Sequence, residues 1–223
     1  MHLQFRKVTT KDKILATSKD LFNEFGFGEP TLNAIAQKVG ISRGNLTYYF
    51  KDKEELLSEL VEEMWEKYEQ RIGRAMQFPS WESTTESTQA YLSLQEEYSF
   101  IFFDIKIASD PKVTKQFARM KKDTIRRQMT TIGFSIQIGN MKAERIPGTY
   151  RNLCESLWMI NFYWLISQSY RDEKEAWDKI IWSSVLPHFT EKGLTSFIAH
   201  FGQDYFDALG ESFDMAKVGT ITF

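Results

Sequence analysis

Hydrophobic residues recur at intervals of three and four positions along most of the chain, the pattern of helices that bury one face. No two alternating apolar runs are joined by Asn-Gly or Asp-Gly, the strongest short signal for a β-hairpin. The pattern therefore predicts an all-α protein.

The first predicted helix begins near Thr9 or Thr10 and ends at Gly26. Thr9 and Asp12 have the spacing of a capping box, in which each side chain accepts a hydrogen bond from the other residue's backbone N–H. The apolar stripe of this helix consists of Ile14, Leu15, Ser18, Leu21, Phe22 and Phe25.

Two shorter helices are predicted next, on either side of a tight turn. Thr31 is the expected N-cap of a helix over residues 32–38, which ends at Gly40. Ser42 then caps a helix over residues 43–49. So short a connection forces a sharp crossing, which is typical of a helix-turn-helix.

Longer helices are predicted beyond this motif. Asp52 and Glu55 form a second predicted capping box, which opens a connecting helix of about residues 53–78. The stretch 80–88 is rich in Ser, Thr and Glu and lacks an apolar period, so it predicts a loop.

Further helices are expected at about residues 91–105, 111–139 (one helix or a pair), 149–170, 174–185 and 191–209, with a loop at 140–148. In the segment 149–170 apolar residues lie nearly all round the helix, which predicts burial on more than one side.

Charge divides the chain unequally. The 223 residues carry a formal net charge of −2, but residues 1–53 hold nine Lys or Arg against five Asp or Glu, a balance of +4 that leaves −6 for residues 54–223. A basic end on an acidic body is expected where one end meets a polyanion, although chance clustering also produces such a difference.

Composition excludes several classes of protein. The single cysteine, Cys154, excludes a disulfide framework and a multi-cysteine zinc site, and fits a reducing compartment. The N-terminal residues MHLQFRK lack the apolar run of a signal peptide, and the most apolar stretch, 153–166, is too short to span a bilayer. We therefore expect a cytoplasmic protein with no membrane partner.

In the predicted helix-turn-helix some residues are expected to pack inward, and others have polar side chains on the outer face. Ala36 is small enough for close helix crossing, Gly40 permits the positive φ of the turn, and Leu46 faces inward. Gly44 costs up to about 1 kcal/mol inside a helix, which suggests close contact with a partner. Donors suited to base edges and phosphates occupy the outer face: Ser42, Arg43, Asn45, Thr47, Tyr48 and Lys51.

The segment TLNAIAQKVGISRGNLTYYFKDKEELL resembles the DNA-binding domain of the tetracycline-repressor (TetR) family of bacterial regulators, and the motif match extends from Thr10 to about Leu60. The family usually has an aromatic residue where this chain has Thr47 and often a histidine at Tyr49, so Tyr48 is expected to take over a phosphate contact. The predicted DNA-binding residues are Thr31, Ser42, Arg43, Gly44, Asn45, Thr47, Tyr48, Tyr49 and Lys53.

Two of these residues have alternative explanations. Thr31 is first a helix cap and second a phosphate ligand, and the two roles are compatible. Lys53 is either a phosphate partner or an ordinary surface charge.

The resemblance also implies a domain plan. Residues 1–53 are expected to form the DNA-binding domain, and residues 54–223 a larger helical domain for effector binding and dimerisation. It implies a homodimer that binds double-stranded operator DNA as a repressor, pairs its last two long helices in a four-helix bundle, and is released by a small effector. The aromatic helices after residue 90 predict that this effector is apolar or aromatic. Candidate pocket residues, for each of which ordinary core packing is an equal alternative, are Tyr98, Phe102, Cys154, Trp158, Asn161 and Trp164.

The alternatives to a regulator are an enzyme and a helical interaction protein that has lost DNA binding. His2, His188 and His200 lack metal-ligand spacing, and the sequence has no Gly-rich phosphate loop, so no catalytic role, metal or cofactor is expected. Two charged groups are expected to be solvated faces: the acidic Asp204, Asp207 and Glu211, and the basic Arg119, Lys121, Lys122, Arg126 and Arg127. Only DNA binding separates the interaction protein from the regulator.

Overall fold

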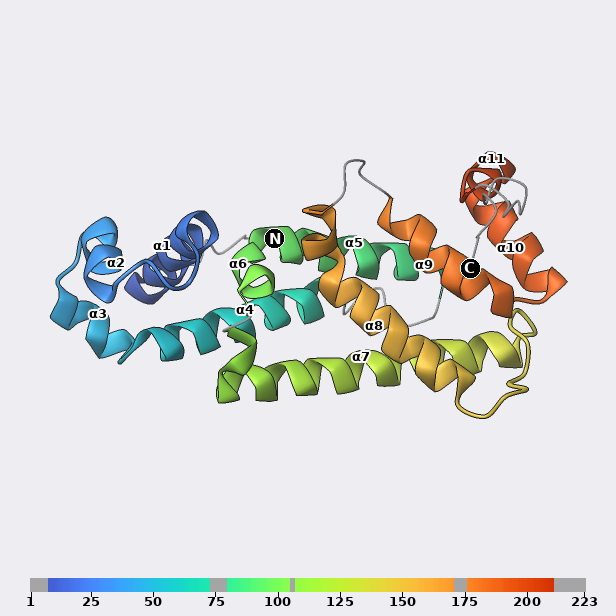
Figure 1. Ribbon diagram of the computed structural model, residues 1–223, viewed down its shortest axis with the longest axis horizontal. Coiled ribbons are helices and arrows are strands. Elements are labelled where there is room, and N and C mark those ends of the chain that lie inside the picture. Colours follow the sequence, from blue (N-terminus) through green and yellow to red (C-terminus); the bar gives the residue numbers. More distant parts are fainter. Residues whose placement is uncertain (1–7, 73–79, 105–106, 171–175, 211–223) are drawn as a thin grey trace, which may run out of the picture. The chain divides into compact units, whose positions relative to one another are not determined.

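The computed structural model describes residues 8–72, 80–104, 107–170 and 176–210, and within these ranges the fold is all-α, as predicted (Figure 1). One isolated bridge joins Met141 to Phe189. The helices are α1 Thr10–Phe25, α2 Leu32–Val39, α3 Arg43–Tyr49, α4 Lys53–Ile72, α5 Trp81–Glu97, α6 Ser99–Phe103, α7 Pro111–Gln137, α8 Thr149–Gln168, α9 Trp177–Val185, α10 Glu191–Phe201 and α11 Gln203–Asp207. Short 3₁₀ turns cover Ile107–Ser109 and Leu186–His188.

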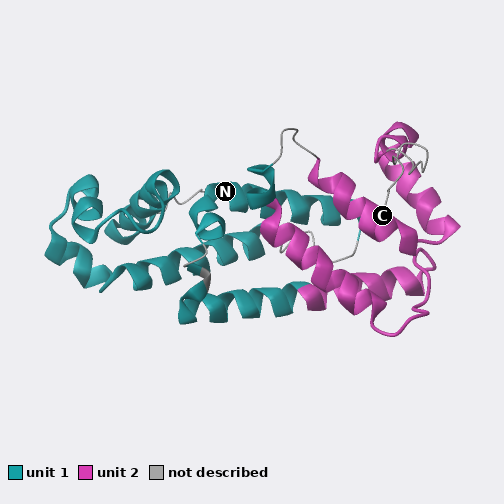
Figure 2. Ribbon diagram, in the orientation of Figure 1, with its two compact units in different colours: residues 1–124, 165–170 teal, residues 125–164, 171–223 magenta. Residues whose placement is uncertain are grey.

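The chain divides into two compact units (Figure 2). Unit 1 comprises residues 1–124 and 165–170, and unit 2 comprises residues 125–164 and 171–223. The predicted domain boundary after residue 53 falls at the start of α4, inside unit 1, and stays a prediction. The predicted end of the connecting helix, near residue 78, lies outside the described residues.

Local capping signals fix the three N-terminal helices as predicted. The Thr9 hydroxyl accepts from the Asp12 N–H (3.1 Å), and the Asp12 carboxylate accepts from the Thr9 N–H (2.8 Å). The Thr31 hydroxyl accepts from the Ala34 N–H (3.2 Å), and the Ser42 hydroxyl accepts from the Asn45 N–H (3.1 Å). These bonds satisfy backbone donors that a helix start leaves unpaired, so each helix begins at its predicted residue.

Two details of this region differ from the prediction. Phe25 is 52% exposed, because Phe22, one turn earlier, fills the inner position and packs against Phe27 and Phe100. At the start of α4 the Glu55 N–H donates to Asp52 as expected, but the Glu55 carboxylate accepts from the Lys51 N–H (2.8 Å).

The loop predicted over residues 80–88 is wrong, because this stretch forms the first half of α5. Its hydroxyl groups donate to backbone carbonyls one turn earlier, as Thr84 does to Ser80 (2.9 Å) and Thr88 to Thr84 (2.9 Å). Side chains that usually compete with a helix are thereby satisfied inside it. The helix predicted over 91–105 is also interrupted, at Tyr98, where the backbone leaves helical geometry (φ −121°, ψ 39°).

In unit 2 the loop at 140–148 is confirmed, and it is fixed to the start of α10. The Thr190 N–H donates to the Asn140 carbonyl (3.0 Å), and the Lys142 N–H donates to the His188 carbonyl (2.9 Å). Gly193 is buried against the Asn140 backbone.

Two predictions in unit 2 need correction. The helix expected over 191–209 breaks at Gly202, whose φ of 93° is incompatible with a continuous helix. Helix α8 is not buried on several sides of the single chain: Tyr150, Cys154 and Leu157 form one buried stripe, whereas Met159 and Tyr163 are 54% and 57% exposed. Among the helices of the described ranges, none combines the length and apolar character needed to cross a membrane.

Candidate nucleic-acid interface

Helix α3 rests on a small apolar core shared with α2. The side chains of Leu46, Ile35 and Ala36 are 0–2% exposed. Gly40 adopts the left-handed conformation (φ 81°, ψ 32°), which lets the chain reverse within three residues between α2 and α3. The inner face of α3 is therefore fixed by packing, and its outer face remains available.

The outer face of α3 presents polar and aromatic groups to solvent. Ser42, Arg43, Gly44, Asn45 and Tyr48 are exposed, and Tyr48 is 84% exposed. The Arg43 guanidinium donates to the Asn33 side-chain oxygen (3.0 Å), so α2 helps to orient it. An exposed guanidinium group and an exposed tyrosine on one short helix are suited to contacts with bases and phosphates.

Thr47 and Tyr49 are half-buried at the edge of this face. The Thr47 hydroxyl donates to the carbonyls of Arg43 and Gly44, both at 3.1 Å, so its donor is used within the helix. The ring of Tyr49 packs edge-on against Tyr48 with 5.3 Å between centroids. Both residues therefore shape the surface that their exposed neighbours present.

No packing contact among the described residues requires a glycine at position 44. A Cβ atom added there would meet only the Ser42 hydroxyl, at 4.0 Å. The absence of a side chain at this helical position is thus not explained by internal contacts of the described residues, which is consistent with close approach of a partner.

Thr31 and Lys53 flank α3 at the starts of neighbouring helices. Thr31 is exposed and caps α2. The Lys53 ammonium donates to the backbone carbonyls of Phe27 and Gly28 and lies 4.7 Å from the centre of the Phe27 ring. Burial lowers the pKa of Lys53. In this structure the Lys53 ammonium group therefore stabilises the segment that connects α1 to α2.

The six predicted effector residues are divided between the units. Tyr98 and Phe102 belong to unit 1, and the four others lie on α8 in unit 2: Cys154, Trp158, Asn161 and Trp164.

Three of these side chains are held by their own surroundings. The Tyr98 hydroxyl donates to Glu63 (2.6 Å). The Asn161 oxygen accepts from the Trp177 indole N–H (2.8 Å). Cys154 is fully buried, and burial raises the pKa of its thiol to about 11.

Sequence reasoning missed an aromatic cluster in unit 1, of which only Phe102 was predicted as an effector contact. The aromatic cluster is lined by Met64, Trp65, Tyr68, Tyr91, Leu94, Gln95, Phe102 and Met120. The Tyr68 ring lies 5.0 Å from Trp65 and 5.8 Å from Tyr91, centroid to centroid. These side chains pack without room for a water molecule, so a ligand would enter only if they moved. Their periodicity predicted core helices but gave no sign that α4, α5, α6 and α7 meet here.

Sequence models of two families together match most of the chain. Residues 14–60 match the model described as bacterial regulatory proteins, tetR family. Residues 61–197 match the model described as bacterial transcriptional repressor, TetR.

Curated relatives align with only part of the chain. The probable HTH-type transcriptional regulator YttP of Bacillus subtilis is 38% identical over 80 residues, which cover 36% of this chain and 39% of YttP. QacR of Staphylococcus aureus is 39% identical over 64 residues, covering 26% of this chain and 34% of QacR. The chain thus spans less than two fifths of the length of either relative.

Solved structures match more than four fifths of the chain at low identity and show the fold. A TetR-family transcriptional regulator from Marinobacter aquaeolei covers 86% of this chain and 97% of its own, with a TM-score of 0.72 and 20% identity. SmeT, the repressor of the Stenotrophomonas maltophilia multidrug efflux pump SmeDEF, covers 82% and 92% with a TM-score of 0.62 and 15% identity. SmeT has also been solved as a triclosan complex, with a TM-score of 0.63, 16% identity and the same two coverages.

Proposed function

Because the chain belongs to the TetR family of bacterial regulators, we propose that it represses transcription by binding a near-palindromic DNA operator as a homodimer. The observation that carries this proposal is the outer face of α3, where exposed polar groups stand on a fixed apolar support. A helix presented in this way fits the major groove of B-DNA.

Each residue of the predicted interface has a role in this proposal. Arg43 and Asn45 read base edges, because guanidinium and amide groups match the donor and acceptor pattern of purines. Tyr48 contacts phosphate, and Gly44 allows the close approach of the DNA backbone. Thr47 offers its methyl group to a thymine methyl, since its hydroxyl is used within α3.

The remaining predicted residues support the approach to the backbone. Ser42 and Thr31 present their helix N-termini, whose N–H groups attract phosphate. Tyr49 positions Tyr48. Lys53 reaches phosphate if it leaves the carbonyls of the α1–α2 connection.

We further propose that residues 1–53 form the DNA-binding domain, and that residues 54–223 bind the effector and dimerise in the cytoplasm. Helix α8 supplies part of the dimer surface, because Met159 and Tyr163 are exposed four residues apart on one helical face. A two-fold dimer matches the symmetry of a near-palindromic operator.

The effector in this proposal is a small apolar or aromatic molecule. Two sites compete for it: the α8 residues predicted from the sequence, and the aromatic cluster of unit 1. The aromatic cluster is favoured by its combination of four rings with Met64 and Met120, since methionine side chains rearrange easily around a ligand.

Selection of bound duplexes from a random DNA library tests the DNA-binding proposal. Purified protein is used at one stated salt concentration, because phosphate contacts make affinity salt-dependent. The expected result is enrichment of a near-palindrome. Failure of a folded, dimeric protein to enrich any sequence, with and without added triclosan, would favour the interaction-protein alternative.

Tryptophan fluorescence with triclosan as the probe separates the two effector sites. If the ligand enters the aromatic cluster, it changes the emission of the wild-type protein, and the change is lost in Trp65→Phe but kept in Trp158→Phe. The reverse result places the ligand beside α8. No emission change with triclosan, or with a panel of other small aromatic molecules, contradicts an aromatic effector at either site.

A further inference from the structure

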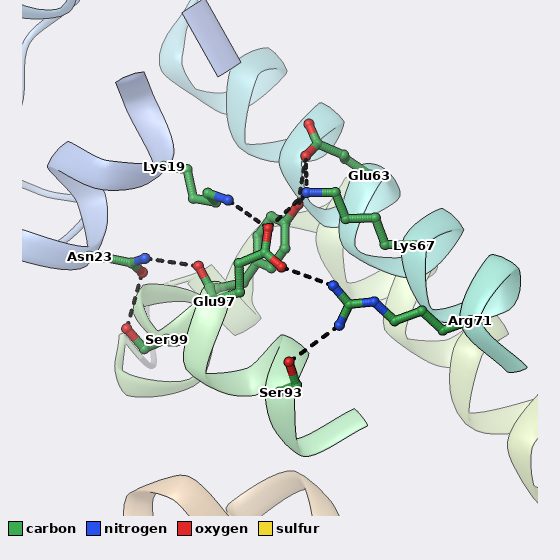
Figure 3. A network of polar contacts seen from close by, with 9 residues as sticks. Lys19, Asn23, Glu63, Lys67, Arg71, Ser93, Glu97 and Ser99 are labelled. Atoms are coloured by element: carbon green, nitrogen blue, oxygen red, sulfur yellow. Dashed lines mark hydrogen bonds and ion pairs between the residues drawn. The ribbon is translucent and has the colours of Figure 1, made fainter. Parts of the chain in front are cut away.

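The C-terminal end of α5 is tied to α1 and α4 by a single carboxylate (Figure 3). Glu97 accepts from Lys19 of α1 at 2.7 Å and from Lys67 of α4 at 2.8 Å. Arg71 of α4 lies 3.4 Å from its second oxygen. One side chain at the C-terminal end of α5 thus joins α1, the first helix of the DNA-binding motif, to α4 and α5.

A second connection joins α1 to the same place through the backbone. The Asn23 amide donates to the Glu97 carbonyl (2.9 Å), and its oxygen accepts from the Ser99 hydroxyl (3.0 Å) (Figure 3). The Asn23 oxygen also accepts from the Phe100 N–H (3.1 Å). The Glu97 carbonyl and the Phe100 N–H lie on either side of the helix break at Tyr98. The break therefore supplies the donor and the acceptor that fix α1.

The ring of Tyr98 contacts both lysine side chains of this network. Tyr98 is fully buried, and the ammonium groups of Lys19 and Lys67 lie 4.9 and 5.1 Å from its ring centre. Its hydroxyl also accepts from Lys67 (2.7 Å) and donates to Glu63. Two cations held against one ring and one carboxylate restrict how α1 can shift along α5.

The position of α1 matters for DNA binding because α2 packs on α1 and α3 packs on α2. We infer that Glu97 is a positioning residue for DNA binding: it holds α1 at the α5–α6 break and thereby sets the direction in which α3 meets DNA. The inference rests on the proposed function, because a fixed direction has a use only where two recognition helices must match two half-sites. Glu97 itself contacts no DNA.

The direct test measures the orientation of the helix-turn-helix in the free protein. Spin labels are attached through Gln37→Cys on α2 and Glu86→Cys on α5, both exposed positions, with labelled protein diluted into unlabelled protein. Glu97→Gln is compared with Glu96→Gln, which makes the same charge change at the exposed neighbouring residue.

We expect the distance distribution to broaden or shift in Glu97→Gln and to stay as in the wild type in Glu96→Gln. Asn23→Ala, on exposed α1 surface, removes the backbone connection and is expected to act in the same direction even if Glu97→Gln folds poorly. Glu97→Asp is expected to restore a narrow distribution in part. Wild-type distributions in both Glu97→Gln and Asn23→Ala would overturn the inference.

The functional test uses a series of duplexes in which the half-site spacing differs by one base pair at a time. Half-site spacing is set by dimer geometry, so we expect the wild type to prefer one spacing by about tenfold and Glu97→Gln to retain only about a twofold preference. An Arg43→Ala variant is expected to lose affinity at every spacing and keep the preference.

The outcomes distinguish the positioning role of Glu97 from the proposed DNA-binding function. An unchanged spacing preference in Glu97→Gln would contradict the positioning role while leaving DNA binding intact. A wild type that binds none of the duplexes would contradict the proposed function, and the spin-label distances would still decide whether Glu97 orients α1.

Discussion

Helices α3 and α5 are both rich in polar residues, but they use them in opposite ways. On α3 the side chains of Arg43, Asn45 and Tyr48 remain exposed after Ser42 and Leu46 have capped and anchored the helix. On α5 the hydroxyls of Thr84, Thr88 and their neighbours are bonded to carbonyls of the same helix. Polar composition alone therefore does not mark an interface. The polar groups of α3 differ from those of α5 in remaining exposed to solvent.

Gly193 on α10 and Gly44 on α3 extend this comparison, because one is packed against another segment and the other is exposed. The larger effect on stability is expected at Gly193. A Cβ atom there would lie 2.0 Å from the Asn140 carbonyl oxygen, which already accepts from the Thr190 N–H. We expect Gly193→Ala to reduce the free energy of unfolding by about 3 kcal/mol or more, as measured by urea denaturation.

Gly133→Ala on α7 is the matched control, since outside the backbone of its own helix no atom of the described residues lies within 4 Å of its added Cβ. It is expected to gain up to about 1 kcal/mol from improved helix propensity. Equal stabilities of the two variants would show that the contact between α10 and the 140–148 loop is not a tight one.

At Gly44 the expected loss concerns DNA binding and not folding. Because the space around its Cβ position is open, Gly44→Ala should leave the protein as stable as the wild type or up to about 1 kcal/mol more stable. Its affinity for the selected operator should fall roughly tenfold, or about 1.4 kcal/mol. Unchanged affinity in a fluorescence anisotropy titration would contradict a close approach at this residue.

Acid should weaken the network around Glu97. Lys19 and Lys67 outweigh the desolvation of Glu97 and lower its pKa to about 2 from an ordinary 4.5. Since the folded pKa is the lower one, the stabilisation is present above about pH 4.5 and is lost as the pH falls towards 2.

Urea denaturation of the wild type and Glu97→Gln along this pH range measures the effect. The wild type should be the more stable at pH 6, and the difference should shrink on acidification. A constant difference would show that the charge of Glu97 does not stabilise the fold.

The smallest effect is expected at Ser18, a fully buried residue of α1. Its hydroxyl has no hydrogen-bond partner among the described residues, so Ser18→Ala should be neutral or gain up to about 1 kcal/mol. Thr190→Ala is a contrasting variant, because its hydroxyl caps α10 and donates to Gly139; it should lose about 1 kcal/mol or more. Calorimetry that ranks the two variants the other way would contradict this account.

The N-terminal helices could be predicted from the sequence because their signals are local. Thr9, Thr31 and Ser42 each cap a helix within three residues, and Gly40 needs only its own backbone conformation. The outer face of α3 follows from the same short segments. By contrast, the role of Lys53 depends on the carbonyls of Phe27 and Gly28, which lie about 25 residues away.

The approximate positions of most later helices could be predicted, but the breaks at Tyr98 and Gly202 could not. The break at Tyr98 is stabilised by Asn23, 75 residues earlier, and no nearby residue marks it. The aromatic cluster likewise joins residues 64–68 to residues 91–120. Such long-range contacts leave no periodic trace in the sequence.

The most direct test of the account is the affinity of the wild type and Arg43→Ala for the selected operator, for single-base variants of it and for a shuffled duplex, at one stated salt concentration. We expect the wild type to favour the operator by about a thousandfold or more. Arg43→Ala should lose about 1–3 kcal/mol and its preference at one base pair, whereas Tyr48→Phe should weaken all sequences alike. Equal wild-type affinity for operator and shuffled duplex, or a uniform loss in Arg43→Ala, would contradict the claim that the outer face of α3 reads DNA sequence.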